Sequence, residues 1–333
     1  MKILWHISLL ILLIESSYAQ DPQLSQYYAA PLYLNPAFTG NTVQSRLILN
    51  YRNQWAAIPG AFISYAFSYD HNLQEINSGA GFMAIHDKAG SGALRFTNLA
   101  GFYSYSAQLN RKLVLKPGVS LSYTLRNINF SDLTFGDQLV RGGNGVTTSE
   151  HPIEPVQYMD AAAGLLLYSE KFWLGTAFHH LNKPNQSLVG GLTRLPLKGS
   201  VHGGYNISIK QDITKKRTTT LTLTAVYKAQ EKWDQLDLGC YMNISPIVLG
   251  LWYRGIPVLK AYQPGYGNND AAIIMFGYEL NTFKIGYSYD ITISRLISNT
   301  AGSHEISIAY EFASPRHQRI RNRKKFYVPC AKF

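Results

Sequence analysis

Hydrophobic and polar residues alternate along much of this chain with a period of two. From Phe283 to Ser294 the alternation is strict, with aromatic or branched apolar side chains on one face and Lys, Gly, Ser, Asp or Thr on the other. The same pattern recurs in four further segments: 61–71, 195–210, 220–228 and 305–312. A period of two is typical of a β-strand with one apolar face. The chain is therefore predicted to be all-β.

The length of these segments separates a membrane barrel from a soluble sandwich. Strands of globular proteins commonly have about five or six residues, whereas a tilted strand needs about ten to cross the hydrocarbon. The alternating segments have the longer length. Fourteen strands are predicted, beginning near Gln44, Ala61, Gly79, Leu94, Leu113, Tyr158, Phe172, Leu195, Thr219, Gln235, Ile247, Ala271, Phe283 and Glu305. We expect a transmembrane antiparallel β-barrel of about 14 strands in an outer membrane.

The connections between the predicted strands differ in length on the two sides of the sheet. Four long ones fall on one side: 130–156, 182–194, 254–270 and 294–303. Those on the other side are mostly tight turns. Bacterial barrels have long outer loops and short periplasmic turns, so the pattern places the long loops outside. It places both termini in the periplasm of a Gram-negative cell.

Four regions follow from this pattern. Residues 1–19 combine Lys2, an apolar stretch and small residues before Ala19, which predicts a secretory signal peptide. Residues 20–43 lack sustained alternation and are predicted to be an ordered, extended N-terminal segment. The barrel is assigned to 44–313, and 314–333 form a basic periplasmic C-terminal tail.

Composition changes this picture little. The chain is 46% hydrophobic and only 15% charged, against about 25% charged in an ordinary soluble protein. This argues against disorder, and the lack of an 18-residue apolar run argues against a bundle of membrane helices. Only Cys240 and Cys330 are present, far too few for a disulfide scaffold. Cys240 is expected to face lipid, and Cys330 to be a free thiol or a cross-link to another protein.

No catalytic, cofactor or metal site is predicted. His179 and His180 are adjacent, so a strand would point them to opposite faces, and no Cys/His spacing fits zinc. No G-x-S-x-G signature marks a nucleophile. We therefore expect a protein that is not an enzyme.

Aromatic and cationic residues gather at predicted outer strand ends. They are Arg52, Trp55, Trp252, Tyr253 and Arg254. Residues of these types often anchor protein partners. The structural alternative is that the aromatics form the interfacial girdle and that the arginines pair with inward carboxylates such as Asp70 and Asp290.

The C-terminal tail is strongly basic. Six of its residues from Arg316 to Lys325 are cations, and the candidates for partner binding are Arg319, Arg321, Arg323, Lys324 and Lys325. In the periplasm such a run could dock to an acidic face of a periplasmic protein or to anionic lipid, whereas nucleic acid is not an expected partner. A solvated tail is the alternative.

A set of motifs in order along the chain resembles a known family. The opening carries Asp21-Pro-Gln-Leu-Ser-Gln-Tyr-Tyr28 and Pro31-Leu-Tyr-Leu-Asn-Pro-Ala-Phe-Thr-Gly40. Later matches are Tyr51-Arg-Asn-Gln-Trp55, His180-Leu-Asn-Lys-Pro-Asn185, Leu251-Trp-Tyr-Arg254, Gly286-Tyr-Ser-Tyr-Asp290 and Ser303-His-Glu-Ile-Ser307. This set resembles the PorP/SprF outer-membrane proteins of the type IX secretion system in Bacteroidota.

The resemblance implies a non-enzymatic barrel that scaffolds the secretion machinery, or that binds cargo with a type B C-terminal domain, as in adhesion and gliding. Expected partners are periplasmic machinery proteins, the cargo domain and outer-membrane lipid. Within the opening motif, Tyr27, Tyr28 and Tyr33 are candidates to contact the barrel wall or a partner. The segment could equally just seal the barrel. A passive solute channel is the alternative function.

Overall fold

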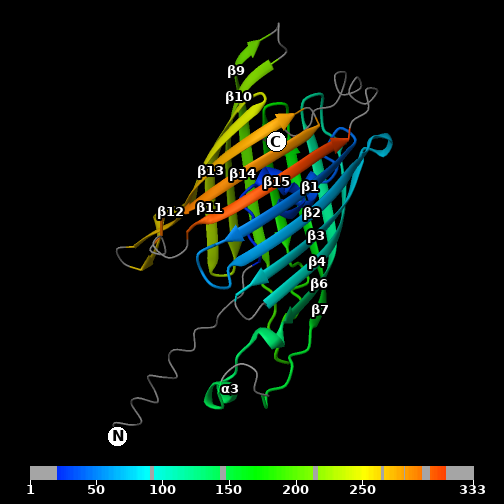
Figure 1. Cartoon of the computed structure of the whole chain (residues 1–333). Coiled ribbons are helices and arrows are strands. Elements are labelled where there is room, and N and C mark those ends of the chain that lie inside the picture. Colours follow the sequence, from blue (N-terminus) through cyan, green and yellow to red (C-terminus); the bar gives the residue numbers. More distant parts are fainter. Residues whose placement is uncertain are drawn as a thin grey trace.

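The strands of the protein form one antiparallel sheet that closes into a barrel. The computed structural model describes residues 21–90, 94–142, 148–212, 217–263, 266–280, 282–294 and 301–312. Closure comes from ten residue pairs between β1 and β15, from Ser45 opposite Phe312 to Gln54 opposite Ser303. The predicted barrel is thereby confirmed (Figure 1), with 14 strands among the described residues if the two-residue β5 is left out.

The strands follow the chain order around the barrel, and β4 also pairs directly with β6. Their bounds are β1 Ser45–Gln54, β2 Phe62–Leu73, β3 Ser78–Ala89, β4 Leu94–Tyr105, β5 Ala107–Gln108, β6 Val114–Ile128, β7 Val156–Tyr168 and β8 Phe172–His179. The remaining strands are β9 Lys198–Asp212, β10 Arg217–Gln230, β11 Trp233–Ile244, β12 Ile247–Gln263, β13 Tyr266–Leu280, β14 Phe283–Thr292 and β15 Ser303–Phe312. Two short helices lie in loops, η3 (Gln74–Ile76) and η4 (Phe130–Asp132), as does α3 (Gly136–Val140).

The alternation places apolar side chains outside and polar ones inside. On β15, Ile306, Tyr310 and Phe312 are exposed on the outer face, while Glu305 and Ser307 are buried on the inner face. The apolar outer band faces the hydrocarbon of the membrane. Because the strands pair around a closed ring, no strand edge with unbonded backbone amides is exposed to lipid. Among the described residues, no helix is long and apolar enough to cross a membrane.

The barrel has two different ends, which we call the loop end and the turn end. The loop end carries the connections 55–61, 129–155, 180–197 and 293–302, and the turn end carries 169–171 and 245–246. The predicted long loop over 254–270 is wrong, because β12 and β13 continue their pairing as far as Gln263 opposite Tyr266, with irregular register beyond Arg254. The neighbouring strands β9 and β10 pair as far as Asp212 opposite Arg217.

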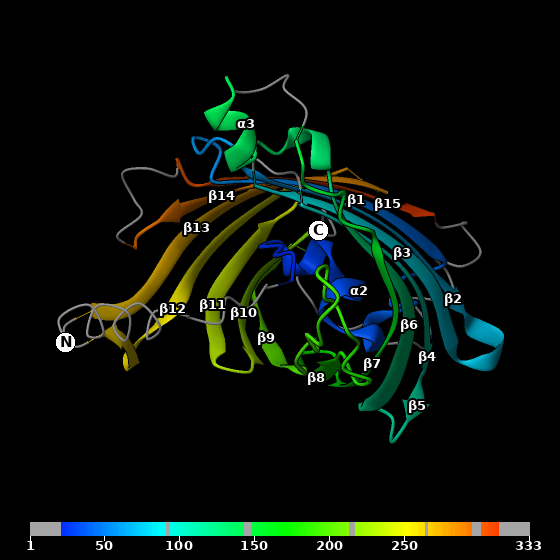
Figure 2. The same ribbon diagram turned by 90° about the horizontal axis from the view of Figure 1, so that it is seen from below.

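Residues 21–40, here called the lumen segment, lie inside the barrel (Figure 2). The prediction of an extended conformation is wrong: η1 (Tyr27–Ala29), α2 (Pro31–Leu34) and η2 (Pro36–Phe38) are short helical turns. Proline has no backbone N–H, but at the first position of a helix that N–H would have no partner within the helix. The φ of proline also suits a helix. Pro31 and Pro36 each hold such a position. Compact turns let the segment fill the lumen's width.

Candidate functional site in the barrel lumen

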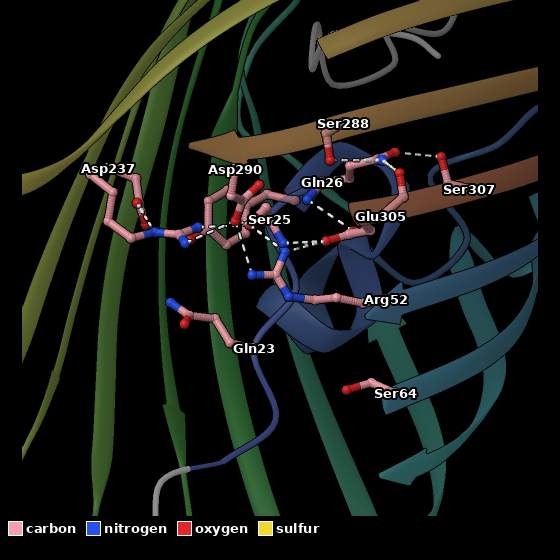
Figure 3. Close-up of polar contacts among 12 residues, drawn as sticks. Gln23, Ser25, Gln26, Arg52, Ser64, Asp237, Ser288, Asp290, Glu305 and Ser307 are labelled. Atoms are coloured by element: carbon pink, nitrogen blue, oxygen red, sulfur yellow. Dashed lines mark hydrogen bonds and ion pairs between the residues drawn. The ribbon is translucent and has the colours of Figure 1, made fainter. Parts of the chain in front are cut away.

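Two buried arginines converge on Ser25 at the loop end of the lumen, and Figure 3 labels one of them, Arg52, beside Ser25. Arg52 of β1 donates to Ser25 Oγ at 2.8 Å, and Arg254 of β12 donates to the same oxygen at 2.8 Å. The Ser25 hydroxyl in turn donates to Asp290 of β14 at 2.6 Å. One serine of the lumen segment thus links three strands of the wall.

Carboxylates balance the two guanidinium groups. Arg52 bonds Asp290 at 2.9 Å and Glu305 at 3.1 Å, while Arg254 bonds Asp237 at 2.8 Å and Asp290 at 3.2 Å. All five side chains are almost completely buried. Charges in such surroundings are tolerated only when they are paired and hydrogen-bonded, so this cluster depends on each of its members.

The backbone of the lumen segment is part of the same cluster. The N–H groups of Ser25 and Gln26 donate to the two oxygens of Glu305, at 2.7 and 3.1 Å. The Gln26 side chain donates to the Glu305 carbonyl at 2.8 Å and to Ser288 Oγ at 3.1 Å. Glu305 therefore holds the peptide itself as well as a side chain.

Tyr27 continues the network toward β10 and β11. Its hydroxyl donates to Asp237 and accepts from Lys228 at 3.1 Å, and the Lys228 ammonium lies 4.2 Å from the centroid of the Tyr27 ring. The ring meets Trp252 edge-on at 5.6 Å.

The first described residue is fastened by a second group of charges, here called the latch. Asp21 accepts from Lys198 Nζ at 2.9 Å and lies 3.0 Å from His180 Nε2, while His180 Nδ1 lies 2.7 Å from Asp160. Burial alone would lower the pKa of His180, but the charges of Asp21 and Asp160 and their hydrogen bonds raise it to about 9. Burial would raise the pKa of Asp21, yet Lys198 and His180 hold it well below its usual value. The latch is ionic at neutral pH.

The turn-end half of the lumen segment is held by close approach. Asn35 caps η2 by accepting from the Ala37 N–H at 2.8 Å, and its amide donates to the Thr176 carbonyl and to His202 Nε2, both at 3.0 Å. A Cβ on Gly164 would lie 1.9 Å from Asn35 Oδ1. Because Gly164 has no Cβ, the Asn35 side chain can pack directly against the barrel wall.

Glycines also shape the end of the segment. A Cβ on Gly118 would lie 2.5 Å from the backbone of Pro36 and Ala37, and one on Gly79 would lie 2.3 Å from the Thr39 carbonyl oxygen. Gly40 adopts a φ of +69°, and its N–H donates to Asp70 at 2.8 Å. The chain therefore leaves the lumen through a tight turn into β1.

A polar cavity of about 250 Å³ opens above the Ser25 cluster at the loop end. Its lining includes Gln23, Arg52, Trp55 and Trp233. Trp55 has a left-handed φ of 59° and packs edge-on against Phe62 at 5.4 Å.

The structure places the residues predicted for partner binding in different surroundings. Arg52, Trp252 and Arg254 are buried and contact the lumen segment, so the expectation that they anchor a partner at the surface does not hold for them. The structural alternative was that these arginines pair with inward carboxylates. Arg52 does pair with Asp290, whereas Asp70 pairs with Arg46 at 3.0 Å.

The tyrosines of the opening motif contact the wall or the segment itself. Tyr28 donates to Gln26 at 2.9 Å and meets Tyr241 edge-on at 5.2 Å, and Tyr33 donates to the Pro22 carbonyl. Tyr253, on the other face of β12, donates to Asn269. Arg319, Arg321, Arg323, Lys324, Lys325 and Cys330 lie outside the described residues.

Several residues of the site are absent from the sequence-based candidates. The sequence did not identify Asp237 and Glu305 as residues that bind the lumen segment. It also did not identify Asn35, Gly164 and Asp160 as residues that position this segment in the barrel. One signal was available: charged residues with inward parity at strand ends on the same side of a barrel. Within the part of the chain that the structure describes, no group of three or more His, Cys, Asp or Glu residues could hold a metal ion.

The comparisons with known proteins point to one family. Residues 16–310 match the family described as "Type IX secretion system membrane protein PorP/SprF". A search of curated proteins finds no match.

Solved structures share the general architecture at low similarity. The P. putida toluene transporter TodX has 11% identity and a TM-score of 0.47 over 84% of this chain and 93% of its own. The CymD monoaromatic hydrocarbon channel has 12% identity and a TM-score of 0.45 over 86% and 93%. The KdgM porin has 9% identity and a TM-score of 0.35 over 80% and 99%.

Proposed function

Because the chain belongs to the PorP/SprF family of type IX secretion system membrane proteins, we propose that it is a non-enzymatic outer-membrane scaffold rather than a passive solute channel. In this role the barrel holds binding surfaces in the membrane. Its periplasmic face engages the secretion machinery, and its loops engage cargo with a type B C-terminal domain.

The observation that carries the proposal is the filled lumen. A channel needs a continuous hydrated path, but the lumen segment crosses the interior and its residues from Leu24 to Gly40 are almost all buried. The segment is bonded to β1, β12, β14 and β15 near the loop end, and to β7 and β8 farther along. A barrel whose wall is bonded to the segment that fills its lumen is suited to act as a rigid platform.

The orientation of the barrel is part of the proposal. Long loops on the outside and tight turns in the periplasm are the usual arrangement of bacterial barrels. In this orientation the loop end faces the outside, and the turn end, where Phe312 lies, faces the periplasmic machinery.

Planar-bilayer recording and secretome analysis together test the proposal. We expect negligible steady conductance from the purified protein, and a changed set of secreted proteins when its gene is deleted. Steady, large conductance with an unchanged secretome would overturn the scaffold and favour the channel. Affinity purification from native membranes then identifies the partners, with machinery proteins or a cargo domain expected among them.

A further inference from the structure

The lumen segment has a direction. Asp21 contacts His180 and Lys198, which flank the long loop between β8 and β9. Gln23 donates to Gln235, near the first residue of β11, at the same end. The segment thus starts at the loop end.

The other end of the segment lies at the opposite mouth. The Thr39 carbonyl accepts from Ser104 at 2.8 Å, close to the end of β4, and Gly40 lies against Gly79 at the start of β3. Both positions belong to the turn end. The segment therefore runs the length of the lumen before β1 begins there.

The last described residue lies at the turn end too. Phe312 is opposite Ser45, the first residue of β1. The first and last described residues are thus at opposite ends of the barrel, and the expectation of two periplasmic termini can hold for only one of these ends.

We propose that the chain crosses the outer membrane once inside its own barrel, so that Asp21 lies beside the long loops, across the membrane from Phe312. With the long loops outside, as proposed above, Asp21 faces the cell surface. It lines the polar cavity, where a surface partner could recognise this end of the segment.

The latch and the glycine contacts support this direction. Ser25 is buried and Asp21 half-buried among charges of the loop-end wall, and moving either to the other end would leave Arg52, Arg254 and Lys198 with fewer partners in a low-dielectric site. At the turn end, Pro36 and Ala37 fit against Gly118, which a shifted segment could not do. The two ends of the lumen are not interchangeable.

Three epitope tags in the full-length protein test the proposal: one after the signal peptide, one after Val189 in the β8–β9 loop, and one after Phe333. Val189 is 84% exposed, so its tag reports the side of the loop end. Antibody binding is measured on intact and on permeabilised cells. We expect the N-terminal tag to behave as the Val189 tag does, labelled on intact cells, and the C-terminal tag to be labelled only after permeabilisation.

An N-terminal tag that follows the C-terminal tag and not the Val189 tag overturns the proposal, whichever way the barrel faces. The untagged protein gives a second measurement that no insertion can disturb. A membrane-impermeant amine reagent is applied to intact cells, and mass spectrometry examines the α-amine of the N-terminal peptide. Modification supports the proposal. If that α-amine is modified only after permeabilisation while a tag after Val189 is reached on intact cells, the proposal is wrong.

Discussion

The two halves of the lumen segment are held in the barrel by different kinds of interaction. From Asp21 to Tyr27 the contacts are ion pairs and charge-assisted hydrogen bonds with Arg52, Arg254, Lys198 and their carboxylate partners. From Asn35 to Gly40 they are mainly close approaches to glycines of the wall, with neutral hydrogen bonds at Asn35 and one carboxylate, Asp70, that accepts from the Gly40 N–H. The first half therefore responds to pH and to charge, whereas the second responds to volume.

This difference suggests how the barrel interior stays closed. The steric half leads directly into β1 and is held mainly by its shape, so it fixes the position of the segment in the lumen. The ionic half begins at Asp21 at the loop end, where it is held by several separate ion pairs and hydrogen bonds. A partner that opens the lumen would act on the ionic half.

The largest effect is expected at Asp290, which accepts from Arg52, Arg254 and Ser25. The Asp290→Asn variant removes the charge shared by two buried guanidinium groups. Breaking a buried ion pair on one side costs about 3–5 kcal/mol. We expect a loss of that size in the free energy of unfolding, measured by urea titration in lipid vesicles, and an increase in conductance as the ionic half loosens.

The matched control is Asp137→Asn. Asp137 also bonds an arginine, Arg141, but in the exposed loop that contains α3. Exposed pairs contribute about 0–1 kcal/mol. Equal losses for the two variants would contradict a special role of the lumen cluster.

The second effect concerns the latch and pH. The raised pKa of His180, about 9, means that its stabilisation is fully present below its ordinary value near 6.5 and is lost as the pH rises through 9. Since one pKa unit corresponds to about 1.4 kcal/mol, the loss amounts to about 3 kcal/mol at most. Asp21, whose pKa is lowered, adds the reverse loss in acid.

Unfolding is followed between pH 6 and pH 10 for the wild type and for His180→Gln. We expect the wild type to lose stability progressively between about pH 6.5 and pH 9, and the variant to start lower and change less over this range. His86, which is exposed on β3, provides the control variant His86→Gln, which should keep the wild-type pH profile. A wild-type profile that is flat up to pH 10 would rule out the latch as an ionic contact.

The architecture was predictable because a period of two and a strand length near ten are local properties. The alternation over 283–294 predicts a strand and also predicts which of its side chains face outward. The structure has β14 there, from Phe283 to Thr292. The long loop over 254–270 was mispredicted because Pro257, Pro264 and several glycines look like loop residues. Backbone pairing with register irregularities nevertheless extends β12 to Gln263.

The site was less predictable, since it depends on contacts between residues far apart in the chain. Ser25 and Asp290 are separated by 265 positions, and no local pattern joins them. The lack of sustained alternation in 20–43 did indicate a segment outside the regular strands, and one expectation was that it seals the barrel. Its helical turns and its direction depend on the shape of the interior, which exists only once the barrel has closed.

A smaller effect is expected in the steric half. The Gly164→Ala variant places a methyl group where Asn35 Oδ1 now lies, and overpacking of this kind costs about 1–3 kcal/mol. The loss should appear in urea unfolding without any dependence on pH. Gly101→Ala is the control, because a Cβ there meets nothing within 4 Å. Asn35→Ala combined with Gly164→Ala should recover part of the loss; no recovery would contradict the direct contact.

The smallest effect is expected outside the lumen, at α3. Val140 is 88% exposed and contributes no packing to the barrel, so Val140→Ser should change the free energy of unfolding by less than about 0.5 kcal/mol. A partner that docks on the loops would nevertheless lose an apolar contact. We therefore expect unchanged urea unfolding together with reduced recovery of loop-binding partners in affinity purification. A variant as unstable as Asp290→Asn would show that this loop supports the barrel, against the division between a self-contained lumen and a surface free for partners.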